Sequence, residues 1–285
     1  MAIPAVAPQN LSQVSDAQLS QYARLIYERT GIKVSPQKKT LLSNRVRRRL
    51  RETGISGFDA YLAHLRKLPP KAPEWDAFLQ EITTHETFLF RDEGQWAWFR
   101  QEFLPGCQEA AQKRKRNKQL RIWSAASSTG DEAYTMASCV AACLLPHPGW
   151  MVRILGTDIG IGAVEQANNP VFSERAMRLV PKDYHRFFNK AKDASIWEPK
   201  PILRKLVSFR HHNLLDRLRE SPFDLVVLKN VLIYFDADSK KRVLKNVCSV
   251  IRPGGLLMTG AAEGVANMLE GCQRLQPWLH RRLPD

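Results

Sequence analysis

The stretch Asp224-Leu-Val-Val-Leu-Lys-Asn-Val-Leu-Ile-Tyr-Phe235 begins as an apolar, β-rich run that stops abruptly at a lysine and an asparagine. A similar run, Ile122-Trp-Ser-Ala-Ala126, leads into Ser127-Ser-Thr-Gly-Asp-Glu132 earlier in the chain. Buried strands that end in this way deliver their last residues to the carboxyl edge of an α/β sheet, where such proteins bind ligands. With Asp158 at the end of a strand between them, the two stretches predict a nucleotide-type site.

Strand and helix patterns alternate from residue 120 onward. Strands are predicted at Leu120–Ala126, Val152–Thr157, Phe223–Leu228 and Gly254–Gly260, and helices at Glu132–Leu145, Gly162–Ala167 and Ser239–Val250. This alternation is typical of a parallel sheet with right-handed crossovers, which places the chain in the α/β class. Residues 171–212 interrupt the pattern with a charged, irregular segment.

A small helical domain is predicted before the sheet. Apolar residues recur at helical spacing from Leu19 to Leu65, and Gly31 and Gly54 separate the helices. Pro69-Pro-Lys-Ala-Pro73 then breaks the pattern and indicates a linker. We therefore expect a helical domain at residues 11–70 and a sheet domain at 71–285, with an insertion at about 171–212.

Composition limits the class of protein and of partner. Apolar residues make up 44% of the 285 residues, enough for a sizeable core. No apolar run approaches the ~20 residues that cross a bilayer, and the first residues lack the pattern of a secretory signal. We expect a cytoplasmic protein without membrane insertion. The net charge of +15 indicates an acidic partner, which could be nucleic acid, anionic lipid or an acidic protein surface.

The five cysteines are not spaced as metal ligands. Cys139 and Cys143 lie four residues apart on a predicted helix, but no second pair completes a zinc site. We interpret the cysteines as free thiols and expect no bound metal.

Two stretches carry acidic residues at predicted strand ends. The loop around Gly130 lacks the glycines of a dinucleotide fingerprint and the Gly-Lys-Ser/Thr of a P-loop. Its small residues allow a ligand to approach the backbone, and Asp131 and Glu132 suit a cationic group, although they equally suit the start of a helix. Asp158 is placed to accept hydrogen bonds from ribose hydroxyls, with a helix N-cap as the alternative.

Asparagine and arginine side chains complete the candidate site. Asn213 and Asn230 each follow a predicted strand, and an amide that both donates and accepts suits an adenine edge or an amino-acid head group. Arg91 closes the segment 83–92 and could bind a carboxylate through a bidentate fork. Taken alone, each of these residues also fits an ordinary turn or surface position.

Taken together, these blocks resemble the CheR-type chemotaxis receptor methyltransferases. The blocks that carry the resemblance are Tyr27-Glu-Arg-Thr-Gly-Ile32, Arg45-Val-Arg-Arg-Arg-Leu50, Glu86-Thr-Phe-Leu-Phe-Arg91, Ile122-Trp-Ser-Ala-Ala126, Ser128-Thr-Gly130, Thr157-Asp158, Asn213-Leu-Leu-Asp216 and Asn230-Val-Leu-Ile-Tyr-Phe235. Any one block is weak, but their order and spacing are specific. The resemblance implies a Rossmann-like, S-adenosylmethionine (SAM)-dependent methyltransferase sheet, a small N-terminal all-helical domain and a small β-subdomain insertion. It also implies methylation of receptor glutamates, with S-adenosylhomocysteine as the product of the donor.

The resemblance also implies roles for individual residues. Arg91 and Tyr234 match active-site positions. The positions that match contacts to the cofactor are His85, Thr87, Arg91, Gly130, Asp131, Glu132, Asp158, Asn213, Leu214, Asn230 and Val231. Among these, Glu132 matches the acidic residue that holds the methionine amino group, and Asp158 matches the ribose ligand.

The chain departs from the family pattern at three places. Asp131 stands where the family usually has glutamate, and Lys229 stands where it has arginine. His85 replaces a common asparagine that touches the cofactor. The last two changes bear on affinity and rate.

The basic helix offers a docking surface for the substrate. Arg45, Arg48 and Arg49 are spaced to share one helix face, and we expect them to dock the acidic methylation helices of chemoreceptors. A merely solvated arginine face is the alternative. We expect a monomer that does not bind nucleic acid. Two other functions stay open at this point, a nucleic-acid methyltransferase and a non-catalytic SAM-binding module.

Overall fold

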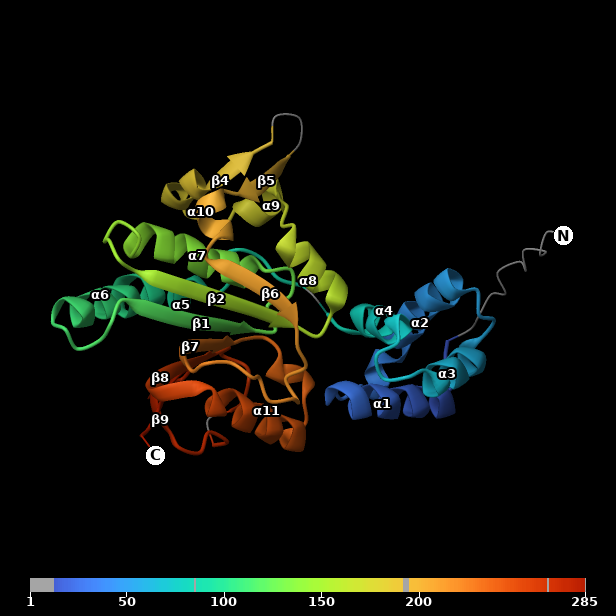
Figure 1. Ribbon diagram of the computed structural model, residues 1–285. Helices are drawn as coiled ribbons and strands as arrows, with labels where there is room; N and C mark the ends of the chain where they lie inside the picture. Colours follow the sequence, from blue (N-terminus) through green and yellow to red (C-terminus); the bar gives the residue numbers. More distant parts are fainter. Residues whose placement is uncertain (1–12, 85, 192–194, 266, 285) are drawn as a thin grey trace. The chain divides into compact units, whose positions relative to one another are not determined.

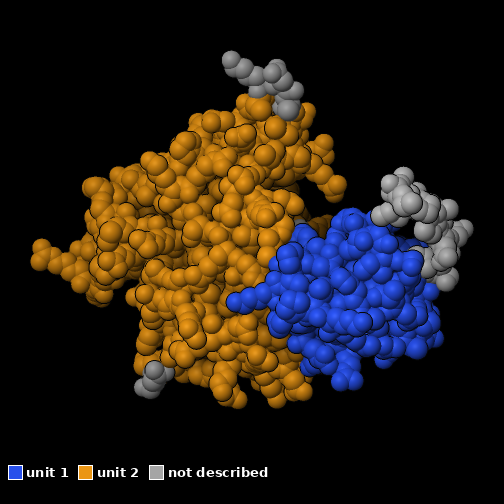
Figure 2. Space-filling view, turned by 45° about the vertical axis from the view of Figure 1, so that its right-hand side comes forward, with its two compact units in different colours: residues 1–84 blue, residues 85–285 orange. Residues whose placement is uncertain are grey.

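The computed structural model describes residues 13–84, 86–191, 195–265 and 267–284. The chain forms two compact units that divide after Thr84, which Figure 2 shows in separate colours. The predicted boundary at residue 70 is therefore wrong. The proline-rich stretch 69–73 is a turn inside the first unit, because the helix that follows it packs against the unit's second helix.

The first unit is a helical domain with its own core. Its elements are α1 (Asp16–Thr30), η1 (Pro36–Lys38), α2 (Lys39–Thr53), α3 (Phe58–Lys67) and α4 (Pro73–Ile82). Ser15 starts α1 through a capping box, in which its hydroxyl accepts from the Gln18 amide. Tyr22, Val46 and Phe78, from three different helices, are fully buried together with the other core residues. Because each helix buries one apolar stripe here, this unit has a core of its own.

The second unit is built on a seven-stranded sheet with the order β6-β2-β1-β7-β8-β10-β9 (Figure 1). Its strands are β1 (Gln119–Ala125), β2 (Met151–Asp158), β6 (Val207–His211), β7 (Phe223–Leu228), β8 (Ile251–Thr259), β9 (Cys272–Gln276) and β10 (Leu279–Arg282). The strands from β6 to β8 pair in parallel, and β10 runs antiparallel to both β8 and β9. The five parallel strands therefore share one carboxyl edge, as the sequence predicts.

Helices cover both faces of this sheet. They are α5 (Glu93–Trp98), the π-helical turn η2 (Phe99–Phe103), α6 (Leu104–Gln112), α7 (Asp131–Cys143), α8 (Ile161–Asn168), η4 (Leu232–Tyr234) and α11 (Ala237–Ser249). In β1, Ile122 belongs to the core shared with α6 and α7, whereas Trp123 belongs to the core shared with α11. Alternate residues of one strand thus serve two cores. Among the described residues, no helix is long and apolar enough to span a bilayer.

The insertion between α8 and β6 carries a small antiparallel sheet in the order β3-β5-β4. Its elements are β3 (Phe172–Ser173), α9 (Glu174–Met177), η3 (Lys182–Phe187), β4 (Phe188–Lys190), β5 (Ile196–Pro199) and α10 (Pro201–Arg204). The predicted end of the insertion at residue 212 is too late, because Val207–His211 pairs with β2 in the main sheet. The strand β6 lies at the edge of the sheet and has exposed side chains among partly buried ones, so it contains no apolar run that would predict a strand.

A glycine of β2 sets how closely the main sheet packs beside the candidate site. A Cβ atom at Gly156 would lie 2.4 Å from the ring of its register partner Phe209. We expect Gly156→Ala to lower the free energy of unfolding by about 1–3 kcal/mol, because the ring or the strand must shift. Urea denaturation of the full chain measures this. The matched control is Gly106→Ala, where nothing lies within 4 Å; equal loss in both variants contradicts the prediction.

Candidate functional site

The loop after β1 presents its backbone in an uncommon conformation. Ala126 and Ser128 have φ values of 64° and 50°, and Gly130 has 91°. Non-glycine residues pay a cost in this left-handed region, and they tend to occur where a loop is shaped for function. At Gly130 a Cβ atom would meet both Ala167 and Phe209 at 3.0 Å. The glycine predicted in this loop is therefore required both by its φ and by the space around it.

Asp158, the last residue of β2, is hydrogen-bonded to the segments that follow β1, β2 and β6. Asp158 is 7% exposed; its Oδ2 accepts from the Ser128 amide at 2.8 Å, and its Oδ1 accepts from the Gly160 amide at 2.9 Å. Its carbonyl oxygen accepts from the His212 amide at 2.9 Å, just past β6. The carboxylate is thus fixed at the end of β2 by amides of the two neighbouring loops. The alternative role as a helix N-cap does not hold, because Gly160 occupies the N-cap position of α8.

The two acidic residues at the start of α7 have different environments. Asp131 is buried, and its Oδ2 accepts from the Thr129 hydroxyl at 2.7 Å. Oε1 of Glu132 accepts from the Ser124 hydroxyl at 2.7 Å. Burial raises the pKa of the Glu132 carboxyl, and the positive charge of Lys229 offsets part of that shift. Burial raises the pKa of Asp131 as well.

The segment before α5 brings Arg91 to the same region. The Phe90 amide donates to the Thr135 hydroxyl at 2.9 Å, which fastens this segment to α7. Arg91 donates to the Glu86 carbonyl at 3.1 Å and lies 5.5 Å from the ring centre of Phe88. The positive charge of Arg91 offsets a small part of the shift that burial causes in the pKa of the Glu132 carboxyl. The bond between Phe90 and Thr135 therefore brings the segment that carries Arg91 to the first turns of α7.

Two further predicted contacts come from this segment. Thr87 is partly buried there. His85 lies outside the described residues.

The ammonium group of Lys229 contacts both Arg91 and Asp92. Its ammonium group lies 3.0 Å from Asp92 Oδ2 and donates to the Arg91 carbonyl at 3.2 Å. It also lies 4.7 Å from the ring centre of Trp96, and its side chain is 2% exposed. The lysine that replaces the family arginine is therefore a buried cation with several partners, next to the acidic start of α7.

Removal of this cation is expected to cost stability. Lys229→Met should lower the free energy of unfolding by about 2 kcal/mol, because an ion pair, a charged hydrogen bond and a cation–π contact are lost. Urea denaturation measures this, with Lys241→Met on the exposed side of α11 as control. If both variants unfold at the same urea concentration, Lys229 has no such role.

The turn after β7 carries Asn230, Val231 and Tyr234. Asn230 has a φ of 58°, and the Val231 amide donates to Glu263 Oε1 at 3.2 Å. Glu263 is 1% exposed; burial raises its pKa, and the amides of the turn oppose that shift. Sequence reasoning did not assign Glu263 a role. The one available signal was an acidic residue just past a strand end, in Gly260-Ala-Ala-Glu263.

Asn213 and Leu214 lie just beyond β6. Asn213 Oδ1 accepts from the Leu215 amide at 3.0 Å, which is the turn geometry given above as the alternative. Leu214 is 8% exposed, and its carbonyl accepts from the Asn246 side chain at 3.1 Å. The structure thus places the predicted residues of the second unit, His85 aside, on the carboxyl side of the sheet or in segments fastened to it.

Comparison with known proteins identifies the family. A model described as "CheR methyltransferase, SAM binding domain" matches residues 85–276, and one described as "CheR methyltransferase, all-alpha domain" matches residues 17–83. The chain belongs to the CheR methyltransferase family. The division between the two models coincides with the division after Thr84 in the structure.

Relatives within the CheR family match over almost the whole chain. The "Chemotaxis protein methyltransferase" of Salmonella typhimurium is 32% identical, over 90% of this chain and 86% of its own length. The protein of the same name in Escherichia coli is 30% identical, over 90% and 87%. "Chemotaxis protein methyltransferase 1" of Pseudomonas aeruginosa is 31% identical, over 89% and 92%. These matches confirm the predicted family, the α/β fold with its helical domain, and SAM as the cofactor.

The residues of this CheR chain fit a cationic donor. Glu132 keeps a carboxylate in a buried setting that raises its pKa, and the ammonium group of SAM would offset that burial cost. Asp158 places a carboxylate, an acceptor that suits a ribose diol, at the end of β2. The donor set of the carboxyl edge therefore agrees with the family's cofactor.

The basic helix of the helical unit differs from the prediction at one residue. Arg49 is only 8% exposed, and its guanidinium bonds Glu74 through two nitrogens, at 3.0 and 2.6 Å. Its expected exposure is wrong, because it turns inward beside the apolar stripe of α2. Arg48 stays exposed and pairs with Glu81 at 3.1 Å. Arg45 donates to the Ile82 carbonyl and, at 3.2 Å, to the Thr84 hydroxyl.

Proposed function

We propose that this chain transfers the methyl group of SAM to glutamate side chains of chemoreceptors. The observation that carries the proposal is a buried Glu132 carboxyl in a CheR-family site, whose pKa burial raises and the charges of Lys229 and Arg91 partly lower again. The carboxylate suits the ammonium group of the donor, and the guanidinium suits a carboxylate acceptor. An uncharged or cationic acceptor would gain less than a carboxylate from an arginine in that place.

Each residue of the candidate site has a place in this proposal. Glu132 holds the amino group of SAM and Asp158 holds its ribose. The remaining positions that would surround the cofactor are His85, Thr87, Gly130, Asp131, Asn213, Leu214, Asn230 and Val231. When bound, SAM supplies an electrophilic methyl group on a sulfonium sulfur.

The chain's own task is alignment rather than proton transfer. A glutamate side chain, with a pKa near ~4.3, is already ionised at neutral pH and needs no general base. Arg91 would hold the incoming carboxylate in line with the methyl group, and Tyr234 would shape the space around it. Holding two reactants in an attack geometry removes much of the entropic part of the barrier.

A methyl-transfer assay tests the acceptor. Membranes that contain methyl-accepting receptors are incubated with the full chain and methyl-labelled SAM, and the products are then treated with base. Release of labelled methanol is expected, because carboxyl methyl esters are base-labile. Base-stable label in nucleic acid would support the nucleic-acid alternative, which the family match does not favour. Binding of SAM without transfer to any receptor would support the non-catalytic alternative.

The exposed arginines of α2 are proposed to dock the acidic receptor helix. Arg48→Ala should raise the KM for receptor membranes several-fold at low salt, and less at high salt, with little change in kcat. Initial rates at two ionic strengths measure this. Arg24→Ala on α1, whose side chain is 80% exposed, is the control and should change neither constant. Equal effects in both variants would argue for a merely solvated face.

A further inference from the structure

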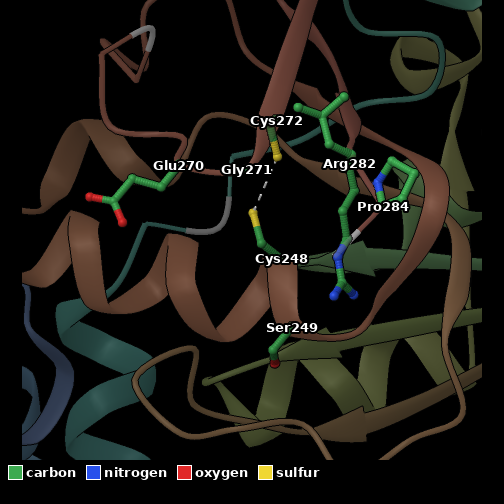
Figure 3. Close-up of a pocket in the computed structure, with 8 residues that line it drawn as sticks. Cys248, Ser249, Glu270, Gly271, Cys272, Arg282 and Pro284 are labelled. Carbon is green, nitrogen blue, oxygen red and sulfur yellow. Dashed lines mark hydrogen bonds between the residues drawn. The ribbon is translucent and has the colours of Figure 1, made fainter.

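A cavity of about 310 Å³ lies far from the carboxyl edge and contains two cysteines (Figure 3). Cys248 is in the last turn of α11, and Cys272 is the first residue of β9. The helix α11 delivers the chain to the start of β8, and β9 runs parallel to β8 because both are antiparallel to β10. Both cysteines therefore lie at the amino edge of the sheet, opposite Glu132.

The two thiols face each other across the cavity. Their Sγ atoms are 4.0 Å apart, and Figure 3 shows the side chains pointing toward one another from different elements. Both residues are partly exposed, and all five cysteines of the chain are free. Arg282 lines the same cavity and is the cross-strand register partner of Cys272. A disulfide between the two cysteines requires the two sulfurs to approach to about 2.05 Å.

The other cysteines have different surroundings. Cys107 and Cys139 are buried, and burial raises the pKa of each thiol. Burial also raises the pKa of the Cys143 thiol. Cys272 is the exception: a hydrogen bond from Cys248 and the charge of Arg282 hold its pKa below the usual value. Thiolate character and access are what make a cysteine reactive, so this pair stands apart.

We propose that Cys248 and Cys272 form a dithiol that peroxides oxidise reversibly to a disulfide. This site is independent of the proposed methyl transfer, because it lies at the opposite edge of the sheet and involves no residue of the candidate site.

The chemistry balances with hydrogen peroxide as the oxidant. The Cys272 thiolate attacks one peroxide oxygen, the O–O bond breaks, and the departing hydroxide takes up a proton to leave as water. This step forms a sulfenic acid on Cys272. The Cys248 sulfur then attacks the Cys272 sulfur, the S–O bond breaks, and the thiol proton of Cys248 leaves with the hydroxyl group as a second water. Two electrons pass from the two thiols to one peroxide, and a dithiol reductant reverses the change.

The disulfide would close a loop that reaches the other edge of the sheet. The chain between the two cysteines contains β8 and Glu263, whose carboxylate accepts from the Val231 amide. A cross-link between its ends removes conformations from the unfolded chain. The oxidised protein should therefore melt about 5 °C above the reduced protein.

Thiol counting and peptide mapping of the reduced full chain test the proposal. With a few equivalents of hydrogen peroxide, two of the five thiols should be lost, and the intact mass should fall by two hydrogen atoms. A digest should contain the Cys248 peptide linked to the Cys272 peptide, and dithiothreitol should separate them. A disulfide that involves any other cysteine would overturn the proposal, as would survival of both thiols while other cysteines oxidise.

Single variants test the order of the steps. In Cys248→Ser the sulfenic acid has no partner, so dimedone should label Cys272. In Cys272→Ser dimedone should leave Cys248 unlabelled, and equal labelling of the two variants would overturn the assignment of the attacking thiol. Cys143→Ser is the matched control and should form the Cys248–Cys272 disulfide normally. Mapping of the wild-type chain decides the pairing even if a variant does not fold.

Discussion

Replacing Arg91 with alanine is expected to lower kcat/KM for receptor methylation by about 100-fold, while the Kd for SAM changes much less. The guanidinium would align the acceptor carboxylate with the methyl group, and a misplacement of about 1 Å can cost a factor of this size. Initial rates with labelled SAM give the first quantity. Calorimetric titration with SAM and with S-adenosylhomocysteine gives the second.

Two control variants sharpen the test of Arg91. Arg153→Ala removes an exposed arginine from β2 and should leave both quantities unchanged. Arg91→Lys keeps the charge but loses the planar fork, so it should recover only part of the rate. An equal loss of turnover and of SAM affinity in Arg91→Ala would instead assign the residue to the cofactor alone.

Replacing Glu132 with glutamine is expected to weaken SAM binding by about 10- to 100-fold. The variant keeps a hydrogen-bond partner for Ser124 but removes the charge that would meet the ammonium group, and charged hydrogen bonds contribute about 1.5–3 kcal/mol. Calorimetry at neutral pH measures the effect. Glu165→Gln on the exposed side of α8 should bind SAM as the wild type does. Unchanged affinity in Glu132→Gln would remove this residue from the proposed site.

The raised pKa of Glu132 also predicts the stability of the Glu132→Gln variant. Burial raises the pKa in the folded chain above its unfolded value, so the ionised carboxylate costs folding free energy at every pH above the raised pKa. Glutamine removes this cost, and the variant should be at least as stable as the wild type at neutral pH. Thermal melts at pH 7.5 would therefore separate lost binding from lost folding. In the wild type, SAM affinity should fall as pH drops through the raised pKa.

Four of the five parallel strands were predictable from sequence, because each contains a run of apolar residues. Phe223–Leu228 is buried at every position, and its polar ending marks where the chain leaves the sheet. The outer strands gave no such signal. β6 alternates exposed and partly buried residues, and β9 has no fully buried residue, so both resemble loops in composition. The polar residues at strand ends therefore predicted the position of the carboxyl edge, but the sequence did not predict how many strands the sheet contains.

Side-chain partners were harder to predict than strand ends. Arg49 has the spacing of an exposed residue, but Glu74 on α4 draws it inward, a contact across 25 positions that no local pattern contains. Glu263 reaches the turn at Val231 across 32 positions in the same way. The sequence shows that Lys229 replaces the family's arginine, but its contacts with Asp92 and Trp96 are seen only in the structure. The spacing of charged residues predicts the exposed face of a helix only where no residue distant in the sequence pairs with one of them.

The separate core of the helical unit has an evolutionary consequence. Tyr22, Val46 and Phe78 are buried among residues of that unit, so substitutions on the exposed side of α2 leave this core unchanged. Recognition of a new receptor could then be selected through surface arginines while the chemistry is inherited unchanged.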